Sequence, residues 1–224
     1  MKKYAVIVAG GSGQRMGAGL PKQFLFLKGK PLLQYTIQSF LQAFDDMNII
    51  LVLPLAYINK RKEIIKEMKA EEKIDITAGG DTRFQSVKNG LGYITHPSVV
   101  FVHDGVRCMV SQKLIQNCYQ QAMLKGSAIP AIAATDSIRI DEVTAHYTID
   151  RNKVRIIQTP QTFRSEILAE AFKQEYKPAF TDEATVVEAA GKEVFLIEGE
   201  YNNFKVTRPI DLCIAEKLLE EANL

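Results

Sequence analysis

The amino-acid sequence predicts an α/β fold with a mainly parallel, twisted sheet that helices cover on both faces. Short runs of β-branched and other apolar residues alternate along the chain with longer helical patterns. These short runs are apolar almost throughout, as is typical of strands buried on both faces of a parallel sheet. The length of 224 residues suits one domain with a substantial core, so we expect residues 1–224 to fold as a single unit.

Each predicted element follows from this alternation, with a strand at each short apolar run and a helix at each longer pattern between two runs. The predicted strands are Tyr4–Ala9, Ile49–Leu53, Ile74–Ala78, Val99–His103, Ala128–Ala133 and Val194–Ile197. The predicted helices are Pro31–Ala43, Leu55–Lys69, Arg83–Ile94, Ser111–Lys125, Ser165–Lys173, Thr181–Ala190 and Arg208–Ala222.

One segment, residues 135–159, breaks the alternation. Its sequence, TDSIRIDEVTAHYTIDRNKVRIIQT, indicates short strands with alternating polar residues and no helix. The alternating isoleucines cannot all find a core within the segment itself. Two arrangements satisfy them: a protruding β-arm that packs on a second copy of the chain, or a hairpin that lies on its own domain.

Composition excludes several classes of protein. The 28 basic and 26 acidic residues leave a net charge of +2, which is too small an excess of positive charge to indicate binding to nucleic acid or to a membrane surface. The apolar run after Lys3 is too short for a signal peptide, and no later stretch is long and uncharged enough to span a bilayer. Cys108, Cys118 and Cys213 are odd in number and widely spaced, so we expect reduced thiols in a cytoplasmic protein.

The glycine-rich turn after the first strand indicates a phosphate site. Its sequence is GGSGQRMG, and it lacks the Lys-Ser or Lys-Thr that a P-loop requires. The dinucleotide pattern GxGxxG fails at Met16, and Pro54 stands where the second strand should end in an acidic residue. The glycines instead let backbone N–H groups approach an anion, and Arg15 and Lys22 follow them with two positive charges. This combination suits a triphosphate that is substituted at its α-phosphorus, because negative charge then builds up on the leaving pyrophosphate.

Further candidate segments follow from the rule that ligands of such sheets bind beyond the carboxyl ends of the strands. This rule selects Gly10–Lys22, Pro54, Gly79–Arg83 and Asp104–Arg107.

Motifs in these segments and beyond resemble those of one family. They are AGGSGQRMG with PKQF (Ala9–Phe24), GGDTRFQSV (Gly79–Val87), VHDGVR (Val102–Arg107), TIDR (Thr148–Arg151), QTPQTF (Gln158–Phe163), TDEA (Thr181–Ala184) and NFKVTRP (Asn203–Pro209). In this order they resemble the 2-C-methyl-D-erythritol 4-phosphate cytidylyltransferases, a family of sugar and polyol-phosphate nucleotidyltransferases. The resemblance runs nearly end to end. It implies a Rossmann-like three-layer nucleotidyltransferase fold with a protruding β-arm for dimerisation.

The resemblance also implies a reaction, in which CTP and methylerythritol phosphate give the CDP-linked alcohol and pyrophosphate with the help of Mg²⁺. The acceptor phosphate attacks the α-phosphorus in line, so the protein contributes positioning and charge neutralisation. Arg15, Lys22 and Lys205 are the implied catalytic cations. Asp104, at the end of the fourth predicted strand, is the implied ligand of the ribose or the metal, and a carboxylate there suits Mg²⁺. His103 beside it faces the other way and is expected to be structural.

The resemblance divides the remaining site residues between the two substrates. The CTP-binding residues are Ala9, Gly10, Gly11, Gly13, Gly80, Asp81, Ser86 and Asp104, and the polyol-phosphate-binding residues are Arg107, Ser137, Arg151, Thr159 and Thr181. Two of these residues have an alternative interpretation as helix N-caps, Asp81 for the helix from Arg83 and Thr181 for the helix that follows it. In the family, the arginine at Arg151 reaches the neighbouring subunit's site, so the resemblance implies a homodimer through the 135–159 arm.

Two departures from the family pattern fall near Asp104. Gly105 stands where relatives have alanine, and Cys108 stands where they have proline, which leaves the rigidity of the loop after Asp104 open. Ser137 replaces the usual threonine and keeps its hydroxyl.

Three other functions remain as alternatives. A ribitol-5-phosphate cytidylyltransferase shares the glycine loop but differs from TIDR and TDEA on the acceptor side. An NAD-dependent oxidoreductase would need the missing acidic residue. A non-catalytic nucleotide-binding regulator would not need Arg15, Lys22 and Lys205 together.

Overall fold

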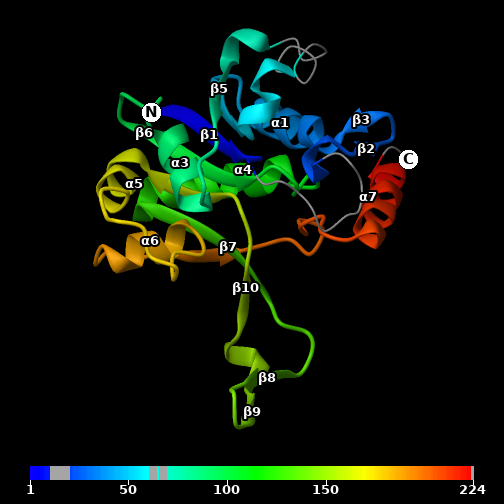
Figure 1. Ribbon diagram of the computed structural model, residues 1–224, viewed down its shortest axis with the longest axis vertical. Helices are drawn as coiled ribbons and strands as arrows, with labels where there is room; N and C mark the ends of the chain where they lie inside the picture. Colours follow the sequence, from blue (N-terminus) through cyan, green and yellow to red (C-terminus); the bar gives the residue numbers. More distant parts are fainter. Residues whose placement is uncertain (11–20, 61–64, 66–69, 223–224) are drawn as a thin grey trace.

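A computed structural model describes residues 1–10, 21–60, 65 and 70–222, and Figure 1 shows a twisted sheet with a hairpin projecting from one side. The parallel part of the sheet has the strand order β6-β1-β4-β5, with β5 at the edge. β1 (Lys2–Val8) lies between β4 (Met47–Leu53) and β6 (Ser98–Asp104), and both pairings are parallel. β5 (Ile74–Ala78) continues the parallel arrangement beside β4. The predicted α/β class with a mainly parallel sheet is confirmed.

Two strands of the sheet were not predicted as sheet strands. β11 (Gln161–Arg164) lies antiparallel between β6 and β7 (Ser127–Ala133), so β6 and β7 do not pair directly. β10 (Arg155–Ile157) belongs to the segment predicted to form the arm, yet it pairs antiparallel with β7 in the main sheet. β12 (Leu196–Glu198) runs parallel to β7.

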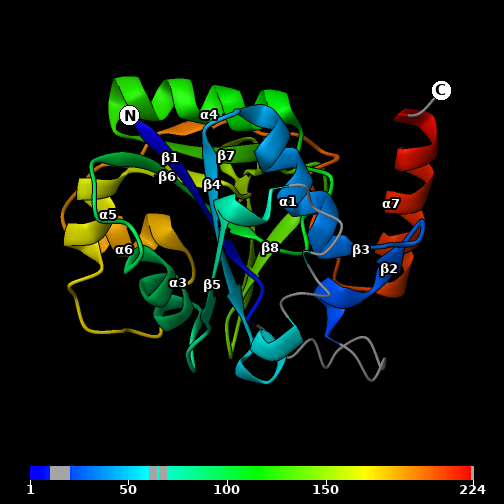
Figure 2. The ribbon, with the colours of Figure 1, turned by 90° about the horizontal axis from the view of Figure 1, so that it is seen from above.

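Helices form a layer on each face of the sheet, as Figure 2 shows from above. Side chains such as Ile7 and Phe101 pack against α1 (Leu32–Ala43) and α4 (Gln112–Lys125). Their neighbours Val6 and Val102 point the other way and pack against α3, α5 and α6. The second layer is formed by α3 (Arg83–Leu91), α5 (Ser165–Ala171) and α6 (Glu183–Ala189). Strands that are apolar throughout therefore contribute side chains to the core on each face of the sheet, as predicted.

A smaller unit lies beside the sheet rather than on either face. α7 (Pro209–Ala222) packs near the hairpin of β2 (Phe26–Leu27) and β3 (Lys30–Pro31), at the edge where Figure 2 shows the C-terminus. Leu27, Cys108 and Ala215 share its apolar cluster. The predicted helix Leu55–Lys69 begins as a 3₁₀ helix over Leu55–Lys60, and most of its remainder lies outside the described residues.

The arm extends away from the body (Figure 1). Its tip is an antiparallel hairpin of β8 (Ile138–Asp141) and β9 (His146–Ile149). Ile140, Val143 and Tyr147 are exposed there. The alternative of a hairpin lying on its own domain is therefore wrong. No helix among the described residues is both long enough and apolar enough to cross a membrane.

Candidate active site

The segments selected by the strand-end rule meet at the carboxyl edge of the sheet. Gly79 donates its N–H to the carbonyl of Leu53 at 2.8 Å, and Gly105 donates to the carbonyl of Val8 at 3.0 Å. A Cβ atom on Gly10 would lie 3.4 Å from Ser86 Oγ and 3.6 Å from Gly79 Cα. The turn after β1 and the turn before α3 are thus close enough to line one site.

Ser86 fixes the turn that precedes α3. It is buried, its Oγ accepts the N–H of Gly80 at 3.1 Å, and its hydroxyl donates to the carbonyl of Thr82 at 2.9 Å. The structure therefore brings Gly10, Gly80 and Ser86 together, as expected for one pocket. Gly11, Gly13 and Arg15 lie outside the described residues.

Both alternative interpretations as helix caps are wrong by one residue. Thr82, not Asp81, caps α3 by accepting the N–H of Gln85 at 3.0 Å. Asp182, not Thr181, caps α6 in a capping box with Thr185. Asp81 and Thr181 are both exposed. Neither predicted site residue is thus needed to cap a helix.

Asp104 ends β6 and is surrounded by cations. Its Oδ1 lies 3.6 Å from Nε of Arg83, and its Oδ2 lies 3.4 Å from Nε of Arg107 and 3.1 Å from Nζ of Lys205. Burial alone would raise the pKa of Asp104, but these cations hold the pKa well below its usual range. The carboxylate is therefore ionised at neutral pH. The side chain of Lys205 is 45% exposed, so this cation can reach both Asp104 and a ligand.

Arg83 is also held by Glu183. Arg83 ends the predicted site segment Gly79–Arg83, but neither residue was predicted to have a specific role. Arg83 Nη1 and Nη2 both pair with the Glu183 carboxylate, and the Nη2–Oε2 distance is 3.0 Å. Burial lowers the pKa of Arg83, but Glu183 and Asp104 outweigh burial and raise it. Both residues lie within motifs of the resemblance, GGDTRFQSV and TDEA, which is the signal that could have found them.

The loop after Asp104 is held on several sides despite the glycine and the cysteine in its sequence. Val106 accepts the N–H of Val206 at 3.0 Å, and Arg107 Nη1 donates to the carbonyl of Asn203 at 2.8 Å. Cys108 is buried, and burial raises the pKa of its thiol to about 11. Cys108 is therefore a neutral thiol that packs the loop rather than loosening it.

Thr159 and His103 form the buried support of this loop. The Thr159 hydroxyl accepts the N–H of Asp104 at 3.1 Å and donates to Nδ1 of His103 at 3.0 Å. His103 Nε2 then donates to the carbonyl of Arg107 at 3.1 Å. His103 is thus structural, as expected. The hydroxyl of Thr159, assigned to the polyol phosphate, is engaged within the protein.

Acid should destabilise the protein through the buried imidazole of His103. Burial lowers the pKa of His103 from 6.5 to about 4. The unfolded chain then binds a proton that the folded chain excludes, so the free energy of unfolding falls as the pH drops from 6.5 towards 4. We expect a loss of about 2 kcal/mol by pH 5, measured by urea unfolding at pH 7 and pH 5. His103→Gln should abolish most of this difference. Equal stability of the original protein at both pH values would contradict the prediction.

Lys22 approaches the site from the other side. It begins the 3₁₀ helix η2 (Lys22–Phe24), and its Nζ donates to the carbonyl of Thr207 at 3.0 Å. Thr207 is two residues from Lys205, so the structure brings the segments of two predicted catalytic lysines together. Gln23 Nε2 anchors η2 by donating to the carbonyl of Ala9 at 2.6 Å.

The predicted acceptor residues of the arm segment, Ser137 and Arg151, do not take part in the ion pairs described for Asp104. Ser137 and Arg151 are exposed, and Arg151 Nη1 donates to the carbonyl of Thr135 at 2.7 Å. Their segments lead into the projecting arm of Figure 1.

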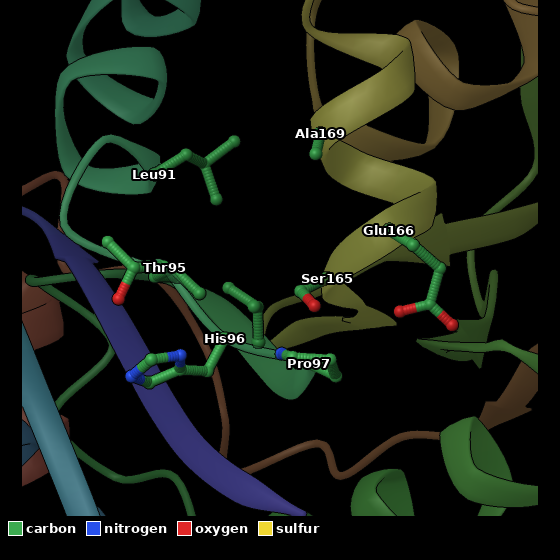
Figure 3. A pocket seen from close by; sticks show the side chains of 9 residues that line it. Leu91, Thr95, His96, Pro97, Ser165, Glu166 and Ala169 are labelled. Carbon is green, nitrogen blue, oxygen red and sulfur yellow. The ribbon is translucent and has the colours of Figure 1, made fainter.

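A pocket at the amino end of β6 is not this site. Residues from α3, from the loop after it and from α5 line the pocket, and Figure 3 shows them. Its lining includes Leu91, His96 and Glu166. The pocket lies at the opposite end of β6 from Asp104, and none of the predicted site residues lines it.

The fold and the cations gathered at its carboxyl edge are those expected of a nucleotidyltransferase. The chain matches the family described as IspD, 2-C-methyl-D-erythritol 4-phosphate cytidylyltransferase, over residues 4–221. It belongs to that family, which confirms the expected enzyme class.

Individual relatives agree with this assignment. The chain is 46% identical to a 2-C-methyl-D-erythritol 4-phosphate cytidylyltransferase of Phocaeicola vulgatus, over 98% of this chain and 100% of the relative. It is 44% identical to the same enzyme of Bacteroides fragilis with the same coverage. The crystal structure of the enzyme from Thermus thermophilus has 31% identity and a TM-score of 0.78, over 98% of this chain and all of that one. A 4-diphosphocytidyl-2C-methyl-D-erythritol synthase of Anaerococcus prevotii has 26% identity and a TM-score of 0.84, over 98% and 96% of the two chains.

Proposed function

We propose that this protein transfers the cytidylyl group of CTP to 2-C-methyl-D-erythritol 4-phosphate. The products are 4-diphosphocytidyl-2-C-methyl-D-erythritol and pyrophosphate, in the non-mevalonate route to isoprenoids. The observation that carries the proposal is the gathering of Arg83, Arg107 and Lys205 around Asp104 at the edge where the glycine turns meet. Cations in such number suit a reaction between two phosphate-bearing substrates.

The base and ribose of CTP bind between the turns after β1 and before α3. Backbone groups of Ala9, Gly10 and Gly80, with the side chains of Asp81 and Ser86, distinguish cytosine by its amino group and carbonyl. The proximity of Gly10 to Ser86, where a Cβ atom would lie 3.4 Å from Oγ, supports this pocket. Gly11 and Gly13 add backbone N–H groups for the phosphates.

The transfer is a direct substitution at the α-phosphorus. Lys22 and Arg15 hold the triphosphate and stabilise the charge that develops on the pyrophosphate, and Lys205 neutralises both substrates as they approach. The approach of Lys22 to Thr207 supports this convergence, since it brings Lys22 near the segment of Lys205. No covalent intermediate on the protein is required.

Mg²⁺ is the expected cofactor, and it neutralises phosphate charge when bound. Among the described residues, no group of three or more His, Cys, Asp or Glu side chains is placed to hold a metal ion. Asp104 is the candidate protein ligand, and because its oxygens already face Arg83, Arg107 and Lys205, most of the ligands of such an ion would be phosphate oxygens. Asp104 would hold the ion together with the nucleotide.

The acceptor binds at Arg107, Ser137, Thr159 and Thr181, and its phosphate is held by Arg151 from the arm of a second copy. The exposed apolar side chains of Ile140, Val143 and Tyr147 on the arm support dimerisation. The planar fork of an arginine grips phosphate through two hydrogen bonds. The protein works in the cytoplasm, in keeping with its free cysteines Cys108, Cys118 and Cys213.

Arg151→Ala should raise the KM for the polyol phosphate about a hundredfold and leave the KM for CTP within about threefold. Initial rates at varied concentrations of each substrate measure this. Arg155→Ala is the control, because Arg155 also lies on the arm segment and bonds only to neighbouring backbone carbonyls in the hydrogen bonds described. Equal losses for both substrates would contradict the assignment.

Mixed dimers test whether Arg151 acts in the neighbouring subunit. At an acceptor concentration far below the raised KM of Arg151→Ala, coexpressed Arg151→Ala and Lys22→Met chains should regain about a quarter of full activity, because half of the random dimers then carry one intact site. Chains whose Arg151 serves their own site would show no such recovery.

The proposed function is tested by pyrophosphate release. The protein is incubated with CTP and Mg²⁺ and with either 2-C-methyl-D-erythritol 4-phosphate or ribitol 5-phosphate. We expect rapid release with the first acceptor and release about a hundredfold slower with the second. Preference for ribitol 5-phosphate would move the protein to that alternative, and release with neither acceptor would reject the function.

A further inference from the structure

Glu183 has no part in the mechanism proposed above, and it forms a largely buried pair with Arg83, one of the cations around Asp104. The Glu183 side chain is 1% exposed and that of Arg83 is 27% exposed. The two Nη atoms of Arg83 pair with the two Glu183 oxygens, which leaves Nε to face Oδ1 of Asp104 at 3.6 Å. One guanidinium thus spans two carboxylates, one from the first turn of α6 and one from the end of β6.

Stability alone is a poor reason for this pair. Phe84, Ala184 and Val187 beside it belong to an apolar cluster, where a buried ion pair has no advantage over apolar side chains of similar size. The start of α6 does not depend on Glu183 either. Asp182 caps the helix, and Gln161 accepts the N–H of Ala184 at 2.8 Å.

The pair instead determines how Asp104 is presented. Because Glu183 pairs with both Nη atoms, Arg83 faces Asp104 through Nε, on the side of Oδ1. The other oxygen, Oδ2, is left to Arg107 and Lys205. Without the charge of Glu183, the Nη atoms of Arg83 would be free to pair with Asp104, and Arg83 would compete with Lys205 for that carboxylate.

We propose that Glu183 and Arg83 are positioning residues for cytidylyl transfer, which fix the Asp104 carboxylate so that Lys205 is aligned with the substrates. The inference rests on the proposed function of Asp104 and Lys205. Glu183 lies two residues after Thr181, so the same pair joins the acceptor-binding segment to the CTP-binding edge.

The first test replaces the charge of Glu183 and then the whole pair. Glu183→Gln should lower kcat about thirtyfold and also lower Tm, because it removes the charged partner of both Nη atoms of Arg83. The double variant Arg83→Met, Glu183→Leu should regain the original Tm within about 5 °C, yet remain about tenfold or more below the original kcat. A double variant with the original kcat would show that the pair is merely structural and would overturn the proposal.

A second variant keeps the test decisive if the double variant does not fold. Arg83→Lys retains a cation beside Glu183, but a lysine cannot contact both carboxylates with a planar fork. It should fold and lose about tenfold in kcat. Original kcat in this variant would also overturn the proposal.

Two further comparisons separate positioning from general damage. In an Asp104→Asn background, Glu183→Gln should change kcat by less than about threefold, because its effect passes through Asp104. A full additional loss in that background would contradict the proposal. Asp46→Asn breaks the remote 2.8 Å pair with Lys3 and should lower Tm without changing kcat. If the unsubstituted protein is inactive with 2-C-methyl-D-erythritol 4-phosphate, the proposed function itself is rejected. This result is distinct from every outcome of the variants.

Discussion

Replacing Lys22 with methionine is expected to lower kcat about a thousandfold, with little change in the affinity for the polyol phosphate. A preorganised cation at the developing pyrophosphate acts mainly in the transition state, so its loss appears in kcat. Lys22 is held near the site by the hydrogen bond of 3.0 Å that its Nζ donates to the carbonyl of Thr207. Initial rates of pyrophosphate release under saturating substrates measure the effect.

Lys73→Met is the matched control for this change. Lys73 is another lysine that donates to a backbone carbonyl, that of Asp45 at 2.8 Å, but it lies before β5 at the opposite end of the sheet. Its variant should keep the original kcat. A Lys22→Met protein that folds and retains kcat within about tenfold would contradict the role of Lys22.

Replacing Lys205 with methionine should lower kcat/KM about a hundredfold and raise the KM for both substrates. Lys205 pairs with Asp104 at 3.1 Å while its side chain stays 45% exposed, so it is placed to neutralise both incoming phosphates. Without it, repulsion between the two anionic substrates opposes their approach. Steady-state kinetics with each substrate varied in turn measure both constants.

Lys217→Met controls for the loss of a lysine in the same C-terminal region. Lys217 lies on α7, with its Nζ 3.6 Å from Glu220 and its side chain 67% exposed. Its loss should leave both KM values unchanged. An effect of Lys205→Met confined to one substrate would show that Lys205 does not act between the two.

The parallel part of the fold could be predicted because its signal is local. Runs such as Ile49–Leu53 are apolar on both faces, and only a sheet covered on both sides buries them. β11 has no comparable signal, since Phe163 is its one large apolar residue. Its burial comes from pairing with β6 on one side and β7 on the other, which depends on residues far away in the chain.

The site could be predicted as far as strand ends define it. The rule that ligands bind beyond the carboxyl ends of parallel strands brought Gly10, Gly80 and Asp104 to one edge, where the structure places them. The pairing of Arg83 with Glu183 joins residues 100 positions apart, so no spacing in the sequence indicates it. Both predicted helix caps were one residue too early in the sequence, because neighbouring Asp and Thr residues are almost equally good caps.

The stereochemistry at the α-phosphorus tests the central claim most directly, that the protein aligns CTP and the acceptor for one direct substitution. CTP made chiral by sulfur and an oxygen isotope at its α-phosphorus is turned over with 2-C-methyl-D-erythritol 4-phosphate, and the configuration of the product is determined by ³¹P NMR. A single in-line attack predicts inversion of configuration. Retention would require two substitutions through a cytidylylated protein and would contradict the mechanism proposed for Lys22 and Lys205.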